Sequence, residues 1–196
     1  MRKILCLLIL GTAISAEAKL GIRLGLGASD FYNHKAFVFD EKNMGLGMGL
    51  SYSLGFIYSI DINNVFSIAP GLQYSYYSAS NEFTVKTDSA GFDDMNEVSL
   101  YMQSFEMPIL LRFNIGSFYL EAGPQIGYNN YAKISINNES KKPNLNAFAF
   151  GPSIGGGINT SGGQFGIRAY LGITEYAKNL KGYPWNIQFN LISFFY

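Results

Sequence analysis

Hydrophobic and polar residues alternate with a period of two along most of the chain that follows the first twenty residues. The clearest case runs over residues 45–58, where every even position is large and apolar and nearly every odd position is glycine or serine. This alternation places all apolar side chains on one face of a strand, whereas on a helix they would scatter around the axis. The pattern therefore predicts extended strands with one apolar and one small or polar face.

A second segment, residues 104–131, predicts a hairpin. Two alternating arms meet at Gly116 and Ser117, which are suited to a tight turn. The polar faces of the arms carry Glu106 and Arg112 before the turn and Glu121 after it. A two-residue turn would place Arg112 directly opposite Glu121, and opposite charges facing each other support this register.

The whole pattern predicts eight strands whose connections alternate between long and short. The expected strands cover residues 20–27, 45–58, 66–76, 104–115, 118–131, 147–158, 164–173 and 185–196. This layout is typical of an all-β, eight-stranded antiparallel up-and-down transmembrane β-barrel, with long loops outside and both termini in the periplasm. We expect an outer aromatic girdle of Tyr74, Tyr76, Phe105, Tyr128 and Phe148, and an inner girdle of Tyr58, Phe113, Phe118 and Phe165.

Two features disturb the pattern. Prolines fall inside the predicted strands, where each removes a ladder hydrogen bond, so bulges or local distortion are expected near them; they are Pro70, Pro108, Pro124 and Pro152. In the last strand the apolar residues change parity, which a bulge near Ser193, or fraying beyond it, would explain.

The amino-acid composition favours a membrane protein. Charged residues make up only 14% of the chain, aromatic residues reach 16%, and 22 residues are glycine. Low charge with many aromatic and glycine residues fits a protein whose outside faces lipid. The formal net charge is zero, so a nucleic-acid partner is not indicated.

The first eighteen residues read as a secretory signal peptide. Arg2 and Lys3 precede an apolar core, and a small-x-small site ends at Ala18. We expect cleavage between Ala18 and Lys19, which leaves residues 19–196 as a single barrel domain. The only cysteine, Cys6, would be removed.

The candidate site is a set of charges on the polar faces of the strands: Arg23, Glu106, Arg112, Glu121 and Arg168. An eight-stranded barrel is just wide enough for side chains to fill its interior, and charges enclosed there must be paired and hydrogen-bonded. We therefore expect a structural ion-pair network in the lumen. The alternative is a gated ion path through the same network.

No catalytic, cofactor or metal site is predicted. His34, the single histidine, lies in the first long loop, and no motif connects it to a serine or carboxylate as in an outer-membrane lipid hydrolase. One histidine and no cysteine in the mature chain leave no set of transition-metal ligands. Asp88, Asp93 and Asp94 do not have the spacing of an EF-hand loop.

Several short motifs carry a family resemblance. They are the glycine-rich first strand, residues 20–27; Glu106-Met107-Pro108; residues 119–124; and the aromatic C-terminus, residues 194–196. In their order and spacing the chain resembles the PorT-like outer-membrane β-barrel proteins of Bacteroidetes. The resemblance implies an integral barrel in the outer membrane of a Gram-negative bacterium, and a C-terminal strand recognised by the barrel assembly machinery. It implies no single activity, although the member that gives the family its name is tied to protein secretion.

The sequence thus predicts a barrel without enzymatic activity, embedded in outer-membrane lipid, with a structural or surface-interaction role. Its outer loops would recognise a protein or surface ligand that the sequence does not identify. The alternatives are a small gated channel or secretion-associated barrel, a lipid-modifying enzyme that uses His34, and an exported lipocalin-like barrel with its apolar face inside.

Overall fold

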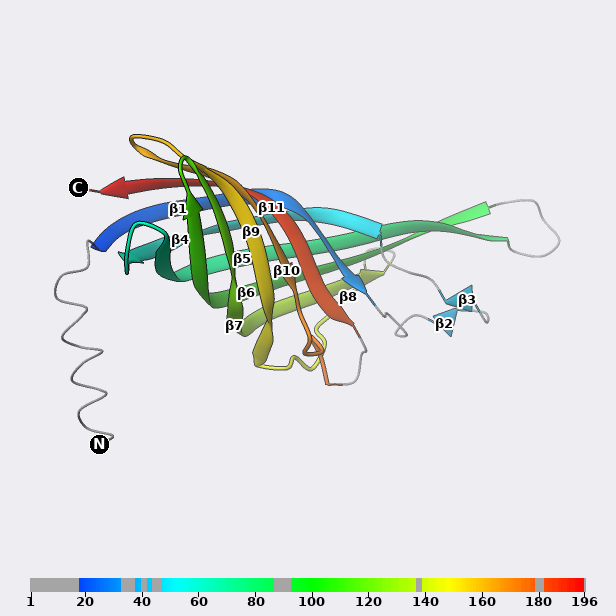
Figure 1. Cartoon of the computed structure of the whole chain (residues 1–196). Coiled ribbons are helices and arrows are strands. Elements are labelled where there is room, and N and C mark those ends of the chain that lie inside the picture. The colour runs from blue at the N-terminus through cyan, green and yellow to red at the C-terminus, as the bar shows by residue number, and fades with distance from the viewer. Residues whose placement is uncertain are drawn as a thin grey trace, which may run out of the picture.

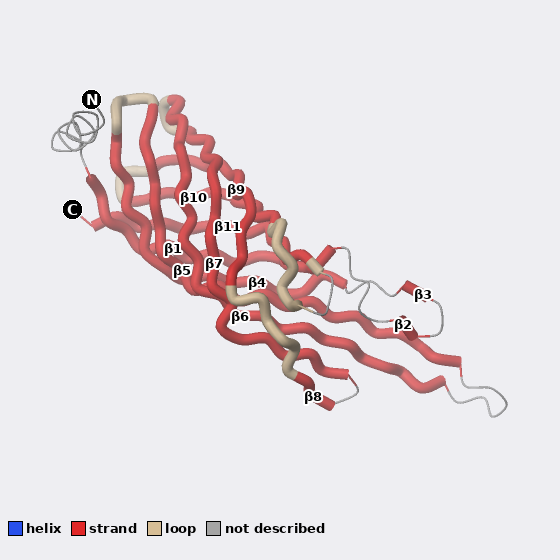
Figure 2. The backbone as a smooth tube through the Cα atoms, turned by 90° about the horizontal axis from the view of Figure 1, so that it is seen from below, coloured by secondary structure: helices blue, strands red, loops and turns tan. Residues whose placement is uncertain are grey.

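The fold was analysed in a computed structural model, which describes residues 18–32, 38–39, 42–43, 47–86, 93–136, 139–178 and 182–195. The predicted signal segment before Ala18, and His34 in the first loop, lie outside these residues. The described chain is built of strands, and none of it forms a helix long and apolar enough to cross a membrane (Figure 2).

Eight long antiparallel strands form a closed ring. Around it they follow the order β6-β5-β4-β1-β11-β10-β9-β7, and pairing of β6 with β7 closes it. Beside the ring lie the short β8 (Glu139–Lys141), which pairs antiparallel with the end of β7, and the small ribbon of β2 (Val38–Phe39) and β3 (Lys42–Asn43). The ring strands are β1 (Ala18–Tyr32), β4 (Gly47–Asp61), β5 (Phe66–Lys86), β6 (Asp93–Ile115), β7 (Phe118–Ile136), β9 (Phe148–Asn159), β10 (Gly163–Leu171) and β11 (Tyr183–Phe195). The predicted eight-stranded barrel is therefore confirmed.

The two ends of the ring differ, as the alternation of connections predicts. The short turns β4–β5, β6–β7 and β9–β10 lie at the end where β1 begins and β11 finishes (Figure 1). The long connections lie at the other end. We call these the periplasmic and the outer end.

The strands are strongly staggered around the ring. Following paired residues from Arg23 through β4, β5, β6 and β7 leads to Ala149 of β9. Following them through β11 and β10 leads to Asn159, ten positions further along the same strand. This stagger tilts the strands, so residues that meet across the lumen come from distant positions in the sequence.

The two faces of the strands have the polarity of a membrane barrel. On β4, Leu50, Leu54 and Phe56 point outward and are more than half exposed, whereas Ser51 and Ser53 are buried inside. The middle parts of the other ring strands follow the same rule, whereas inward apolar residues gather toward the two ends. The lipocalin-like arrangement, which needs the apolar face inside, is wrong.

Aromatic side chains form pairs across neighbouring strands near both ends. Toward the outer end Tyr52 stacks on Tyr76 with ring centroids 4.8 Å apart, and at the periplasmic end Phe66 lies 5.3 Å from Phe113. The predicted girdle residues are all exposed or half-exposed. Rings at these depths fit the two interfaces of a bilayer.

Strands β5 and β6 extend well beyond the ring. Their pairing continues from Ser80–Ser99 to Lys86–Asp93, within the stretch between residues 76 and 104 that the sequence predicts to be a long loop. In Figure 1 this hairpin is the green ribbon that reaches furthest from the ring. The loop prediction is wrong because polar residues can stay in a paired ribbon outside the membrane, where no apolar face is needed.

The prolines interrupt the ladder but do not shift its register. Partners are absent at Pro70 toward β4, at Pro108 toward β5 and at Pro124 toward β6, yet the pairing on either side keeps one register. Pro124 lies directly opposite Pro152 in the β7–β9 ladder. The register shifts fall elsewhere, between Met48 and Ser51 and between Gln103 and Ser104. Local distortion is therefore present, but a bulge at each proline is not.

The predicted bulge near Ser193 is also wrong. The β1–β11 register is unbroken from Tyr183 to Phe195. The parity change instead turns Ile192 and Phe194 into the lumen. There Ile192 is buried against Ile57, Ala69 and Leu110, with Phe194 packed on this group, so apolar residues occupy the periplasmic part of the interior.

One substitution tests the tight packing of this wall. A Cβ at Gly123 would lie 2.1 Å from the Ile109 carbonyl oxygen, which is backbone. We expect Gly123→Ala to lower the free energy of unfolding by about 1–3 kcal/mol, because β6 and β7 must move apart. Gly127→Ala is the matched control on the same strand face, since its Cβ would meet only side-chain atoms, at 3.1–3.4 Å. Urea unfolding in lipid vesicles that ranks the two equally would contradict this account.

Candidate functional site

The charged cluster nearer the periplasmic end of the lumen, which we call the lower cluster, centres on Glu121. Arg112 donates from Nε to Glu121 Oε2 at 2.8 Å, and Arg168 donates from Nε to Oε1 at 2.6 Å. All three side chains are at most 3% exposed. Arg112 also donates to Gln164 Oε1 at 2.8 Å, and its guanidinium lies 5.0 Å from the ring centroid of Tyr119. One carboxylate therefore neutralises part of two guanidinium charges.

The β6–β7 hairpin positions the first of these pairs as the sequence predicts. A two-residue turn at Gly116 and Ser117 joins the strands, with Gly116 at φ 59°, a conformation that glycine adopts readily. Arg112 consequently pairs with Glu121 in the ladder. The predicted register is confirmed.

The upper cluster surrounds Glu106, which is 2% exposed. Its Oε2 accepts hydrogen bonds from Ser75 Oγ at 2.6 Å, Gln73 Nε2 at 2.8 Å and Gln125 Nε2 at 2.9 Å. Its Oε1 accepts one from the Tyr77 hydroxyl at 2.5 Å. Neutral donors thus surround this carboxylate, and no arginine of the described chain forms an ion pair with it.

Arg23 reaches Glu106 only through an amide. It donates from Nη1 to Gln73 Oε1 and from Nε to Asn190 Oδ1, the latter at 2.7 Å. Gln73 in turn donates to Glu106. The structure therefore brings Arg112, Glu121 and Arg168 into direct contact, but it joins Arg23 and Glu106 indirectly. The five charged side chains therefore do not form one directly paired network.

The residues that sequence reasoning missed are uncharged partners of these groups. Gln164, Tyr77 and Asn190 complete the two clusters. Gln164 and Asn190 lie within predicted strands, whereas Tyr77 follows the strand predicted over residues 66–76. Gln73 and Gln125 lie on the polar faces of predicted strands, but no sequence feature assigned them to Glu106. Partner choice across the lumen depends on the stagger of the ring, which the sequence does not show directly.

The outer end of the lumen is covered by two connections that pair with each other. Asn146 donates its backbone N–H to the Tyr176 carbonyl oxygen, and Lys178 donates to that of Asn144, at 3.0 Å and 2.8 Å. Tyr176 and Ala177 are fully buried in an apolar core with inward residues of β5 and β6. This core is formed by Phe31, Tyr77, Ala79, Val98, Leu100, Met102, Ala132, Ile134, Tyr170, Tyr176 and Ala177.

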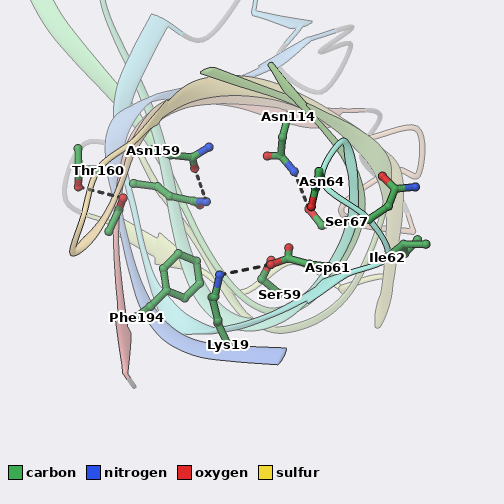
Figure 3. A pocket seen from close by; sticks show the side chains of 13 residues that line it. Lys19, Ser59, Asp61, Ile62, Asn64, Ser67, Asn114, Asn159, Thr160 and Phe194 are labelled. Carbon is green, nitrogen blue, oxygen red and sulfur yellow. Dashed lines mark hydrogen bonds and ion pairs between the residues drawn. The ribbon is translucent and has the colours of Figure 1, made fainter. Parts of the chain in front are cut away.

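The periplasmic end opens into a polar vestibule of about 520 Å³ (Figure 3). Lys19 and Asp61 form an ion pair at its rim with a distance of 3.3 Å. Gln164 is one of its lining residues and donates to Asn159 Oδ1 at 2.7 Å. Because Gln164 also contacts Arg112, the vestibule ends beside the lower cluster.

No group of three or more histidine, cysteine or acidic side chains in the described chain could hold a metal ion. His34, Asp88 and the predicted cleavage region before Ala18 lie outside the described residues. Lys19, on the other side of the predicted cleavage point, is the second residue of β1 and lines the vestibule.

Comparison with known families decides the classification. Residues 14–177 match the outer membrane protein beta-barrel domain. The chain belongs to this family. Its outward apolar faces and aromatic girdles agree with membership, and the protein is an integral barrel of a Gram-negative outer membrane.

Solved structures of the same architecture are similar to this family member at low sequence identity. Neisserial surface protein A, NspA, is 12% identical, with a TM-score of 0.50, and the match covers 91% of this chain and 98% of that one. Ail, the attachment invasion locus protein of Yersinia pestis, solved with the heparin analogue sucrose octasulfate, is 15% identical, with a TM-score of 0.44 and coverage of 90% and 99%. No curated protein matches the chain. The likeness to NspA concerns the fold.

Proposed function

We propose that this barrel is a non-enzymatic surface-interaction protein whose outer hairpin is the contact element. The observation that carries this proposal is the pairing of β5 with β6 far beyond the ring, to Lys86–Asp93. A paired ribbon that projects from a membrane-anchored wall can present a recognition surface outside the membrane. The name of the similarly folded NspA, a surface protein, is consistent with such a role.

The backbone of this hairpin supports the same use. Among the described residues, β4 pairs with β5 only as far as Ser80, and β7 pairs with β6 only as far as Val98. Beyond these points the hairpin has two edges that no described strand occupies. Exposed strand edges can accept a strand from a partner.

The interior supports a structural rather than a conducting role. Two hydrogen-bonded clusters fill the middle of the lumen, and Tyr176 with its neighbours covers the outer end. We further propose that the protein belongs to the PorT-like group within its family, on the strength of the glycine-rich first strand and the aromatic C-terminus.

The experiment places a photo-cross-linking residue in the hairpin of the intact protein in its native cells. We expect position 83 to give a discrete protein adduct, because it lies in the projecting ribbon. Position 64, in the β4–β5 turn at the periplasmic end, is the matched control. An adduct pattern shared by both positions, or none at position 83 in correctly folded protein, would contradict the proposal.

A further inference from the structure

The charges enclosed in the barrel do not cancel. Among the described residues, the buried charged side chains are Arg23, Arg112 and Arg168 against Glu106 and Glu121. Arginine remains protonated in proteins, so the enclosed set carries at least one excess positive charge. An uncompensated charge out of water is costly, because the surroundings cannot solvate it.

Two of these arginines also have N–H groups for which the protein provides no acceptor. Arg112 Nη2 and Arg168 Nη1 are buried, and neither has a hydrogen-bond partner in the protein. Arg168 Nη2 lies 2.6 Å from Glu121 Oε1 and is paired with it. The guanidiniums that share Glu121 therefore have donors available for a further acceptor.

The periplasmic vestibule is connected to this cluster through one shared residue. The vestibule reaches Gln164, whose Oε1 accepts from Arg112 Nη1. Nη2, the free nitrogen, is on the same guanidinium. Tyr119 covers one face of Arg112 with its ring, so the edge of the guanidinium remains the direction of approach.

We propose that the lumen binds one small monovalent inorganic anion, with chloride as the probe, at the free N–H groups of Arg112 and Arg168. It would enter through the vestibule past Gln164. A water molecule would satisfy the donors but would leave the excess charge. A halide does both, and a single negative charge balances the three arginines against the two glutamates. This inference is independent of the proposed surface role.

The test uses the full chain folded in a zwitterionic detergent. Chloride NMR line broadening reports binding directly, and thermal unfolding in sodium chloride is compared with sodium gluconate at equal ionic strength. We expect saturable broadening and a Tm that rises by several degrees in chloride, since a ligand that binds only the folded state stabilises it. Equal Tm values in the two salts, with no saturable broadening, would overturn the proposal.

Two variants locate the site. Gln164→Glu places a carboxylate beside Arg112 and supplies the missing negative charge, so we expect chloride binding to weaken at least about tenfold, that is, by about 1.4 kcal/mol. Arg168→Gln removes the excess charge and some of the free donors, with the same expected result. Lys19→Gln, at the rim, should retain binding. If Arg168→Gln fails to fold, Gln164→Glu decides, and unchanged binding in that variant would overturn the proposed location.

Discussion

Glu121→Gln is expected to destabilise the barrel by about 3–5 kcal/mol, the usual scale for removing one partner of a buried ion pair. Glu121 is the only carboxylate of the described chain that contacts Arg112 and Arg168. Its loss leaves two guanidiniums enclosed side by side, each at most 3% exposed. Urea unfolding in lipid vesicles, followed by the fluorescence of Trp185, measures the change.

Two controls separate this effect from ordinary loss of a surface charge. Arg112→Ala should cost less, about 1–3 kcal/mol, because Arg168 still holds Glu121. Lys19→Gln breaks a pair whose side chains are both 32% exposed, and it should change stability by less than about 1 kcal/mol. If Glu121→Gln costs no more than Lys19→Gln, the cluster is not enclosed as described.

The unequal losses of stability expected for Glu121→Gln and Arg112→Ala differ from the simplest expectation from the sequence, which is that the two losses are similar. In a plain hairpin, Arg112 and Glu121 form a closed pair, and removing either one would leave the other unpaired. The third member, Arg168, comes from β10, which is not a neighbour of β6 or β7 in the ring. Gly155 of β9 pairs with both Glu121 and Arg168, so the two side chains meet over a glycine of the intervening strand. The register of the β6–β7 hairpin alone cannot reveal this contact.

The parts that could be predicted are those fixed by strand parity. The outward faces of β4 and β7 and the inward direction of Arg23 and Arg168 follow from a period of two and from the need to keep charges away from lipid. The eight-stranded ring follows in turn from the number of such segments. These inferences need only short-range geometry.

Strand parity no longer predicts which side chains point inward once a β-bulge inserts an extra residue. The register shift between Gln103 and Ser104 leaves an extra residue in β7, so Ala132 and Ile134 point inward although Asn129 and Gln125 have the opposite parity. The sequence alone gives this bulge no distinct signal. It also builds the outer apolar core, because it directs these side chains toward Leu100 and Met102.

Leu24→Arg is expected to destabilise the barrel by about 2–4 kcal/mol in lipid vesicles, because it places a charge on the outward face near the middle of the hydrocarbon. Leu24 is 48% exposed, and its ladder partners Leu54 and Leu191 are also outward and apolar. On β4, Leu54 lies between Tyr52, which stacks on the outer girdle residue Tyr76, and the inner girdle residue Tyr58. The position therefore belongs to the central band.

Phe118→Arg is the control at the edge of that band. Phe118 is 64% exposed and follows the Gly116–Ser117 turn at the periplasmic end. An arginine there can reach the headgroups and water, so its cost should be about 0–1 kcal/mol. If the difference in stability between the two variants disappears when the lipid vesicles are replaced by detergent micelles, the bilayer is the source of that difference. Equal costs in vesicles would contradict the depth assigned to Leu24, and with it the position of the aromatic girdles at the two interfaces.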